Sequence, residues 1–255
     1  MQTLIFDIET NAIDNFSTLE GLEEILCLSI HNPQSNTTLS YCKDSLSDGL
    51  STLKHADVIV GHNIVKFDIP VIKQLFPQWK PSGLVRDTML MSRLFFTNLS
   101  EEDSRKGWVD RNLIGSHSLK AWGQRLGCNK GDFGSTEGAF DGWTRELQNY
   151  CEQDARVTSK LYSHEYGRQD IEALQLEHDF AEVIQQQEMN GFGFDVERAQ
   201  QLRAELLGRR FIIEASLDDL FPPKRMVMKT PQYYTDPDND MKYDRKRDAP
   251  QKIRT

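Results

Sequence analysis

The acidic side chains near the N-terminus are the first residues of this sequence with a spacing that suits chemistry. Asp7 and Glu9 follow a short apolar run and stand two residues apart. In a β-strand, residues i and i+2 project from one face, so both carboxylates point the same way. Two like charges so close repel each other unless a cation lies between them or one is protonated. A strand that simply runs out into solvent gives the same local pattern.

A later acid lies on the apolar face of a predicted helix. Asp154 shares the stripe of Leu147 and Val157 in the helix expected over 143–165. A buried carboxylate needs a partner, and a metal ion or an arginine would serve. Tyr150 stands one helical turn earlier, so a phenol and a carboxylate face the same place. The alternative is that Asp154 lies partly exposed at the edge of the stripe.

A third acidic position follows a glycine-containing turn in the middle of the chain. Asp68 comes just before Pro70, where an ordinary helix N-cap is as good an explanation as a functional carboxylate. His62 and Asn63 lie in the turn and are candidate hydrogen-bonding residues. Phe67 is a candidate for stacking on a base, although packing in the core explains it equally simply.

Hydrophobic periodicity predicts the elements that must position these side chains. Five strands are expected, at 2–6, 24–30, 37–42, 57–60 and 84–86. Helices are expected at 44–55, after residue 63, and at 88–96, 118–126, 143–165, 170–190 and 195–216. The polar stretches 98–115 and 127–142 are expected to be loops. Three strands followed by alternating strands and helices predict an α/β fold, a mixed five-stranded sheet flanked by helices on both faces.

Composition limits the class of protein. The 255 residues are 38% hydrophobic and 27% charged, which is typical of a globular domain. The net charge of −9 argues against a general nucleic-acid coat, but residues 221–255 contain nine Lys/Arg against five Asp. An acidic body can still bind DNA where divalent cations neutralise the site, and a basic tail adds phosphate contacts. A solvated, mobile end is the alternative for this tail.

Cysteine usage and the N-terminus indicate a cytoplasmic protein. The four cysteines form no metal-binding spacing and are expected to be reduced thiols; they are Cys27, Cys42, Cys128 and Cys151. No apolar run is long enough for a membrane span, and the N-terminus lacks the features of a signal peptide. No membrane partner is therefore expected.

Three short motifs resemble those of a known nuclease superfamily. The segments 7–9, 62–68 and 150–154 are similar to the three exonuclease motifs of the DEDD superfamily. The tyrosine four residues before the last aspartate corresponds to the tyrosine subclass, which includes the proofreading domains of DNA polymerases. The resemblance implies a ribonuclease-H-like fold and a 3′→5′ exonuclease that releases nucleoside monophosphates.

Further blocks resemble the N-terminal part of phage replicative DNA polymerases of family A. They are 7–12, 86–88, 94–99, 115–123 and 188–195, so the likeness covers about residues 1–215. The implied organisation is an exonuclease domain at 1–165, a helical extension at 166–220 that resembles the start of the polymerase region, and a basic, poorly ordered tail at 221–255. Since no palm or fingers region follows, we expect no polymerase activity on this chain. The resemblance implies a role in phage DNA replication, in the cytoplasm of a bacterial host.

The resemblance also implies roles for individual residues. Two divalent cations, Mg²⁺ or Mn²⁺, would be held by four carboxylates; these are Asp7, Glu9, Asp68 and Asp154. In the family pattern Asp7 bridges both ions, Glu9 and Asp154 complete the site of the ion that activates water, and Asp68 supports the second ion. Tyr150 would position the attacking water. The implied substrate-binding residues are Thr10, Asn11, His62, Asn63 and Phe67.

The expected substrate is a single-stranded or frayed DNA 3′ end, because the terminal phosphodiester must leave the duplex to reach the ions. An exonuclease that trims RNA 3′ ends has the same motifs and is the first alternative. The second is a non-catalytic module that binds a 3′ end or docks onto a DNA polymerase subunit. The third is one half of a split polymerase. The sequence does not indicate an oligomeric state.

Overall fold

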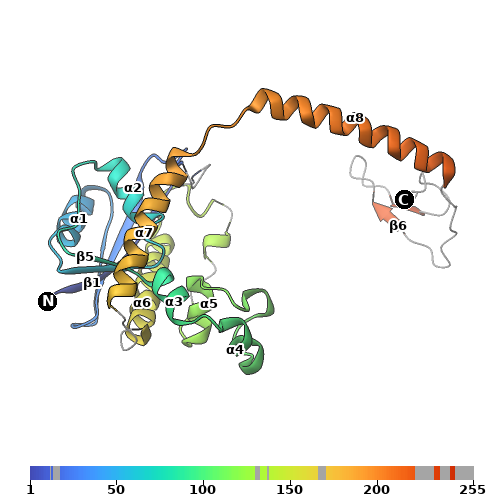
Figure 1. Ribbon diagram of the computed structural model, residues 1–255. Helices are drawn as coiled ribbons and strands as arrows, with labels where there is room; N and C mark the ends of the chain where they lie inside the picture. Colours follow the sequence, from blue (N-terminus) through green and yellow to red (C-terminus); the bar gives the residue numbers. More distant parts are fainter. Residues whose placement is uncertain are drawn as a thin grey trace. The chain divides into compact units, whose positions relative to one another are not determined.

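The computed structural model describes residues 1–11, 13, 18–129, 133–136, 138–165, 171–221, 233–235 and 242–244. The chain forms two compact units, Met1–Gly191 and Phe192–Thr255. All the candidate site residues lie in the first unit, which Figure 1 shows as a sheet wrapped by helices.

A mixed five-stranded sheet forms the centre of the first unit, as the sequence predicts. Its strands are β1 (Thr3–Thr10), β2 (Ile25–Asn32), β3 (Thr37–Tyr41), β4 (Val58–Gly61) and β5 (Leu84–Asp87), in the order β3-β2-β1-β4-β5. The pairs β1/β2 and β2/β3 are antiparallel, whereas β1/β4 and β4/β5 are parallel. The chain crosses over beside β1, and open α/β sheets tend to carry their ligand sites at such crossovers.

Alternating side chains of β1 pack against different layers, so helices cover both faces of the sheet. Leu4, Phe6 and Ile8 join the cluster formed with α1 (Leu46–Lys54) and α2 (Asp68–Leu75). Ile5 packs on the other face in a cluster with residues of α3 (Thr88–Phe95), α6 (Arg145–Glu165) and α7 (Ile171–Asn190). Figure 1 shows α3, α6 and α7 gathered on this second face. The odd-numbered positions of β1, including Asp7 and Glu9, therefore point toward α6.

Two predictions about elements are wrong. The stretch 98–115 is not a loop, because α4 (Leu99–Lys106) lies within it. The buried residues of this helix are Leu99 and Asp103, and Asp103 pairs with Arg125 of α5 (Leu119–Arg125). The first strand also does not end before the acids but continues to Thr10. Antiparallel pairing with β2 extends over both acids and supports them from within the sheet.

The second unit contains α8 (Val196–Leu220) and a short antiparallel pair, β6 (Tyr233–Thr235) and β7 (Lys242–Asp244). The remainder of the predicted basic tail lies outside the described residues, so its predicted lack of order stays a prediction. The helices that the structure describes include none with the length and hydropathy of a membrane span.

Candidate active site

Strand β1 presents Asp7 and Glu9 on the face that α6 covers. Asp7 pairs with Ser29 and Glu9 with Cys27 on β2. The register between β1 and β2 shifts between Glu9 and Thr10. Such a bulge bends a strand and can re-aim its side chains. Both carboxylates are half-buried.

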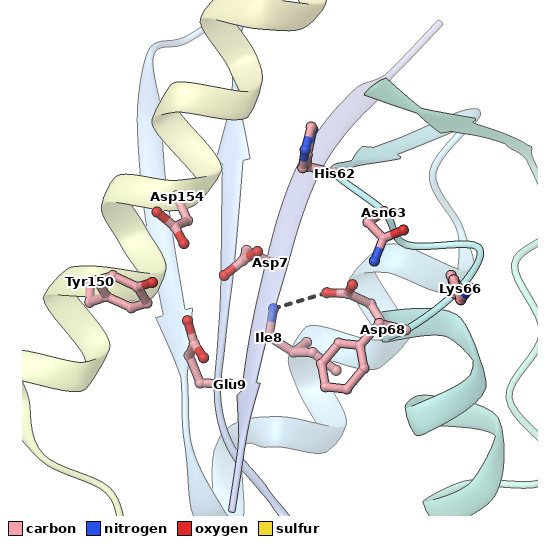
Figure 2. Close-up of a pocket in the computed structure, with 10 residues that line it drawn as sticks. Asp7, Ile8, Glu9, His62, Asn63, Lys66, Asp68, Tyr150 and Asp154 are labelled. Carbon is pink, nitrogen blue, oxygen red and sulfur yellow. Dashed lines mark hydrogen bonds between the residues drawn. The ribbon is translucent and has the colours of Figure 1, made fainter. Parts of the chain in front are cut away.

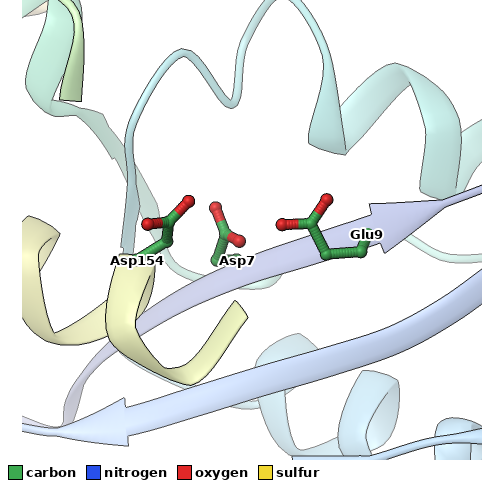
Figure 3. Close-up of side chains that lie close together, drawn as sticks. All are labelled: Asp7, Glu9 and Asp154. Carbon is green, nitrogen blue, oxygen red and sulfur yellow. The ribbon is translucent and has the colours of Figure 1, made fainter. Parts of the chain in front are cut away.

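Helix α6 brings a third carboxylate to the same place. Asp154 is only 2% exposed, which excludes the alternative of an acid at the exposed edge of the stripe. One oxygen from each of Asp7, Glu9 and Asp154 lies within 4.8 Å of the other two. Figure 3 shows Asp7 between Asp154 and Glu9, with the three carboxylates turned toward one another. Two of these acids come from one strand and the third from a helix far along the chain, and carboxylates this close repel one another unless a cation lies among them or one is protonated.

A hydrogen bond from Cys151 connects α6 to β1 next to these acids. Its buried thiol donates a hydrogen bond of 3.2 Å to the carbonyl oxygen of Asp7. Burial, the neighbouring Cys27 and the charges of Asp7 and Glu9 raise the pKa of this thiol well above its ordinary value. Cys151 is therefore a neutral hydrogen-bond donor that links α6 to β1 beside the acids.

Tyr150 lies one turn before Asp154 and faces the same cavity (Figure 2). Its ring packs against Phe133, with 5.9 Å between the ring centroids. A Cβ atom at Gly134 would lie 3.1 Å from the tyrosine hydroxyl, so the absence of a side chain there leaves room for it. The segment around residues 133–134 thus helps to hold the phenol over the acids.

Asp68 lies on the other side of β1 and is not part of the three-acid cluster. It is the first residue of α2, and the N-cap position belongs to Phe67, which makes no capping hydrogen bond through its side chain. The buried Asp68 carboxylate instead accepts a hydrogen bond of 3.3 Å from the backbone N–H of Ile8. Pairing of β1 with β4 stops at Ile5, so this carboxylate takes an N–H group that has lost its strand partner. The N-cap explanation of Asp68 is therefore wrong.

The turn after β4 forms the wall opposite α6. Asn63 adopts a left-handed conformation with φ of 66°, which asparagine tolerates better than most residues. Thr88 Oγ1 donates to the carbonyl oxygen of Gly61, so it must accept the 2.9 Å hydrogen bond from Nδ1–H of His62.

A cavity of about 360 Å³ lies between these walls. Its lining is Asp7, Ile8, Glu9, His62, Asn63, Lys66, Phe67, Asp68, Tyr150 and Asp154 (Figure 2). Eight of these residues were predicted from the sequence; Ile8 and Lys66 were not. Lys66 stands inside the second motif but carried no signal of its own, because a lysine on a loop is normally solvated. Phe67 both lines the cavity and packs on the core, so its two proposed roles are compatible.

Comparison with known proteins gives two results that agree with this geometry. The chain is 28% identical to the DNA-directed DNA polymerase of Escherichia phage T7 and 29% identical to that of Enterobacteria phage T3, in each case over 86% of this chain and 37% of the polymerase. The chain is a homologue of these phage DNA polymerases. It therefore spans little more than a third of the length of the relatives it matches. No family model matches it.

Among solved structures, Brucella melitensis NrnC superimposes on this chain with a TM-score of 0.50 at 18% identity, covering 76% of this chain and 88% of NrnC. At that identity the comparison concerns the fold alone. The predicted ribonuclease-H-like fold of the DEDD exonucleases and the predicted resemblance to phage family A polymerases are both confirmed. This polymerase homologue shares its fold with NrnC and has an acidic cluster in its cavity.

Two predicted substrate-binding residues lie away from the cavity wall. The buried Thr10 donates through Oγ1 to the carbonyl oxygen of Asn11. The side chain of Asn11 donates to the carbonyl oxygen of Gly21 and accepts from the N–H groups of Glu23 and Glu24. Asn11 thus closes the connection between β1 and β2. A direct contact of either residue with substrate stays a prediction.

Proposed function

We propose that this chain is a metal-dependent 3′→5′ exonuclease that removes nucleotides from single-stranded or frayed DNA ends. The observation that carries the proposal is the convergence of Asp7, Glu9 and Asp154 within 4.8 Å at the base of a cavity. Homology to phage DNA polymerases supports DNA as the substrate, and the motif resemblance supports the 3′→5′ direction.

The donor set of the cluster fits a hard divalent cation. All three residues offer carboxylate oxygens, which Mg²⁺ and Mn²⁺ prefer, and the nearby thiol of Cys151 donates to a backbone carbonyl instead. Asp7, Glu9 and Asp154 are the ligands we assign, with Asp68 as a fourth carboxylate on the opposite wall. A bound cation would lower the pKa of water and offset the negative charge that develops on the phosphate.

The remaining residues of the cavity bind and orient the substrate. Tyr150 lines the cavity and packs on Phe133, and we assign it the role of donating a hydrogen bond to a water molecule beside the acids. His62, Asn63 and Phe67 line the opposite wall, where they can contact the sugar and base of the last nucleotide. The cavity is a few hundred Å³, which suits a single nucleotide and not a duplex end. The terminal nucleotide must therefore separate from its complementary strand before it enters.

The test uses single-stranded DNA labelled at the 3′ end or at the 5′ end, with Mg²⁺ or Mn²⁺ and with EDTA. We expect early loss of the 3′ label as a mononucleotide, a ladder from the 5′-labelled strand, and no cleavage in EDTA. Asp7→Ala should abolish cleavage while circular dichroism shows an unchanged fold. Full EDTA-sensitive activity of Asp7→Ala would refute the proposal. If the wild-type protein cleaves an RNA strand of the same sequence faster than the DNA strand, the substrate is RNA and not DNA.

Besides the DNA substrate, we propose that this chain binds a polymerase polypeptide. Helix α8 exposes several large apolar side chains, among them Phe211, Ile212 and Ile213. A helix of this kind gains stability by covering its apolar residues with another chain. Size-exclusion chromatography with a polymerase polypeptide from the same source should show co-elution that Phe211→Asp weakens. Co-elution unchanged by that substitution would exclude α8 as the contact.

A further inference from the structure

A buried carboxylate outside the cavity's acidic cluster holds the turn that forms one cavity wall. Asp87 is the last residue of β5 and is 1% exposed. Its Oδ1 accepts from the backbone N–H groups of Asn63 at 2.8 Å and Met89 at 2.9 Å, and its Oδ2 accepts from Val65 N–H at 3.1 Å. Burial raises the pKa of the Asp87 carboxyl, and the three N–H groups oppose that rise.

These hydrogen bonds determine the shape of the turn between β4 and α2. Asn63 stands in the left-handed region, and its carbonyl oxygen accepts from the N–H groups of Lys66 and Phe67. Asp87 holds the same turn from the other side through Asn63 and Val65. The turn ends directly at Asp68. One carboxylate thus places both the residues that face the nucleotide and the start of the helix that follows.

A histidine of helix α7 forms a hydrogen bond with the backbone of Asp87. Nε2 of the buried His178 accepts the backbone N–H of Asp87 at 2.8 Å, and its Nδ1 lies 2.8 Å from the carbonyl oxygen of Leu174. Since one ring nitrogen must accept and the other must donate, His178 is neutral. Burial lowers its pKa, in agreement with that state. A second link from α7 reaches the turn itself, where Lys66 pairs with Glu188 at 2.7 Å.

We propose that Asp87 is the positioning residue for the 3′-terminal nucleotide, and that His178 extends this function to α7. The inference rests on the proposed function, since it assigns the turn 62–67 as the nucleotide-binding wall. It also assigns α7 to the nuclease site, although the sequence resemblance places this helix beyond the exonuclease domain. Asp87 acts through backbone groups and touches neither the substrate nor the reacting atoms.

Asp87→Asn tests the proposal with little change in volume. Whichever way the amide is turned, its NH₂ group faces at least one of the backbone N–H groups that the carboxylate accepts, so the turn loses a hydrogen bond. Binding of a short single-stranded DNA is measured by fluorescence anisotropy in Ca²⁺, and hydrolysis is measured in Mg²⁺. We expect the Kd and KM to rise about tenfold and kcat to change by less than about threefold. Mn²⁺ binding, measured without DNA, should be unchanged.

Asp103→Asn is the matched control. Asp103 is also buried and accepts several hydrogen bonds, but its partners are Arg125, Trp108 and Gly115, none of which lines the cavity. This variant should lose stability and keep the wild-type Kd and KM. If circular dichroism shows that Asp87→Asn is unfolded, His178→Gln decides the question, with an expected rise in KM of about threefold.

The outcomes separate this inference from the proposed function. Wild-type affinity and KM in Asp87→Asn, or in a folded His178→Gln where the first variant fails to fold, would overturn the role of Asp87. Wild-type protein that binds DNA without hydrolysing it would refute the proposed nuclease activity, while weaker binding by Asp87→Asn would still support the positioning role. Absence of DNA binding by the wild-type protein would overturn both.

Discussion

Replacement of Asp154 by asparagine should stabilise the protein without metal and destabilise it with metal. The carboxylate oxygens of Asp7, Glu9 and Asp154 lie within 4.8 Å of one another. At that distance two full charges repel by about 3 kcal/mol at an effective dielectric constant of about 20. Asp7 and Glu9 are partly exposed, so screening by solvent reduces this value. We therefore expect Asp154→Asn to gain about 1–2 kcal/mol in EDTA, which raises the Tm by about 3–6 °C.

With divalent cations present, the wild-type protein should be more stable than Asp154→Asn. A cation that binds only the folded wild-type protein adds about 2.7 kcal/mol at a concentration of about 100 times its Kd. The asparagine variant lacks one ligand of the cluster and should gain far less at the same concentration. The assay is thermal unfolding, followed by circular dichroism at a pH of about 8 and low ionic strength, in EDTA and across a titration with Mn²⁺. The two Tm curves should cross as Mn²⁺ increases.

The control for this experiment is again Asp103→Asn. Asp103 pairs with Arg125 at 2.7 Å, and both side chains are buried. Loss of one partner leaves a buried charge uncompensated, so this variant should be less stable by about 3–5 kcal/mol in EDTA and in Mn²⁺ alike. If Asp154→Asn also lowers the Tm in EDTA and Mn²⁺ stabilises it as much as wild type, then Asp154 is satisfied by protein groups, and our reasoning about the cluster is refuted.

Three further predictions concern single residues. Tyr150→Phe should lower kcat about tenfold and leave Mn²⁺ affinity unchanged, because it removes only a hydroxyl group; an unchanged kcat would exclude Tyr150 from positioning water. Gly61→Ala should cost roughly 2–3 kcal/mol in urea unfolding, because its Cβ would lie 2.1 Å from Ile64 Cγ2; wild-type stability would show that the turn can shift. Burial, followed by the charge of Asp87, raises the pKa of Glu165 to about 9 from its ordinary 4.5. The folded protein then binds a proton that the unfolded chain releases, so stability should fall as pH rises between these values, and Glu165→Gln should flatten that slope.

Periodic patterns predicted the framework well because burial imposes them. The alternation in β1 placed Asp7 and Glu9 on one face, and the apolar stripe of α6 placed Asp154 inward. Both follow from local geometry, in which period 2 describes a strand and period 3.6 a helix. The sequence could therefore predict which surfaces carry the acids, and the resemblance to exonuclease motifs indicated that these surfaces meet.

Hydrogen bonds between side chains and distant backbone groups could not be predicted from the sequence. The turn at Asn63 depends on Asp87, which is 24 residues later, and Asp87 depends on His178, which is 91 residues later again. Neither partner has a periodic signature, because a buried polar residue looks in sequence like an exposed one. The role of the Asn11 amide in holding the backbone of residues 21–24 could not be predicted for the same reason. The helix at 99–106 was missed because its buried residues are Leu99 and the ion-paired Asp103, which form no apolar stripe.

The four motif acids all carry carboxylates, but their surroundings in the structure differ. Asp7, Glu9 and Asp154 crowd together, and their repulsion favours a cation among them. Asp68 stands apart and accepts the N–H of Ile8, so it gains a partner from the protein itself. Removal of Asp68 therefore takes this acceptor away from the backbone N–H of Ile8, which lies between Asp7 and Glu9 on β1. A loss of activity in Asp68→Ala must accordingly be compared with its effect on stability before it is taken as evidence for a metal ligand.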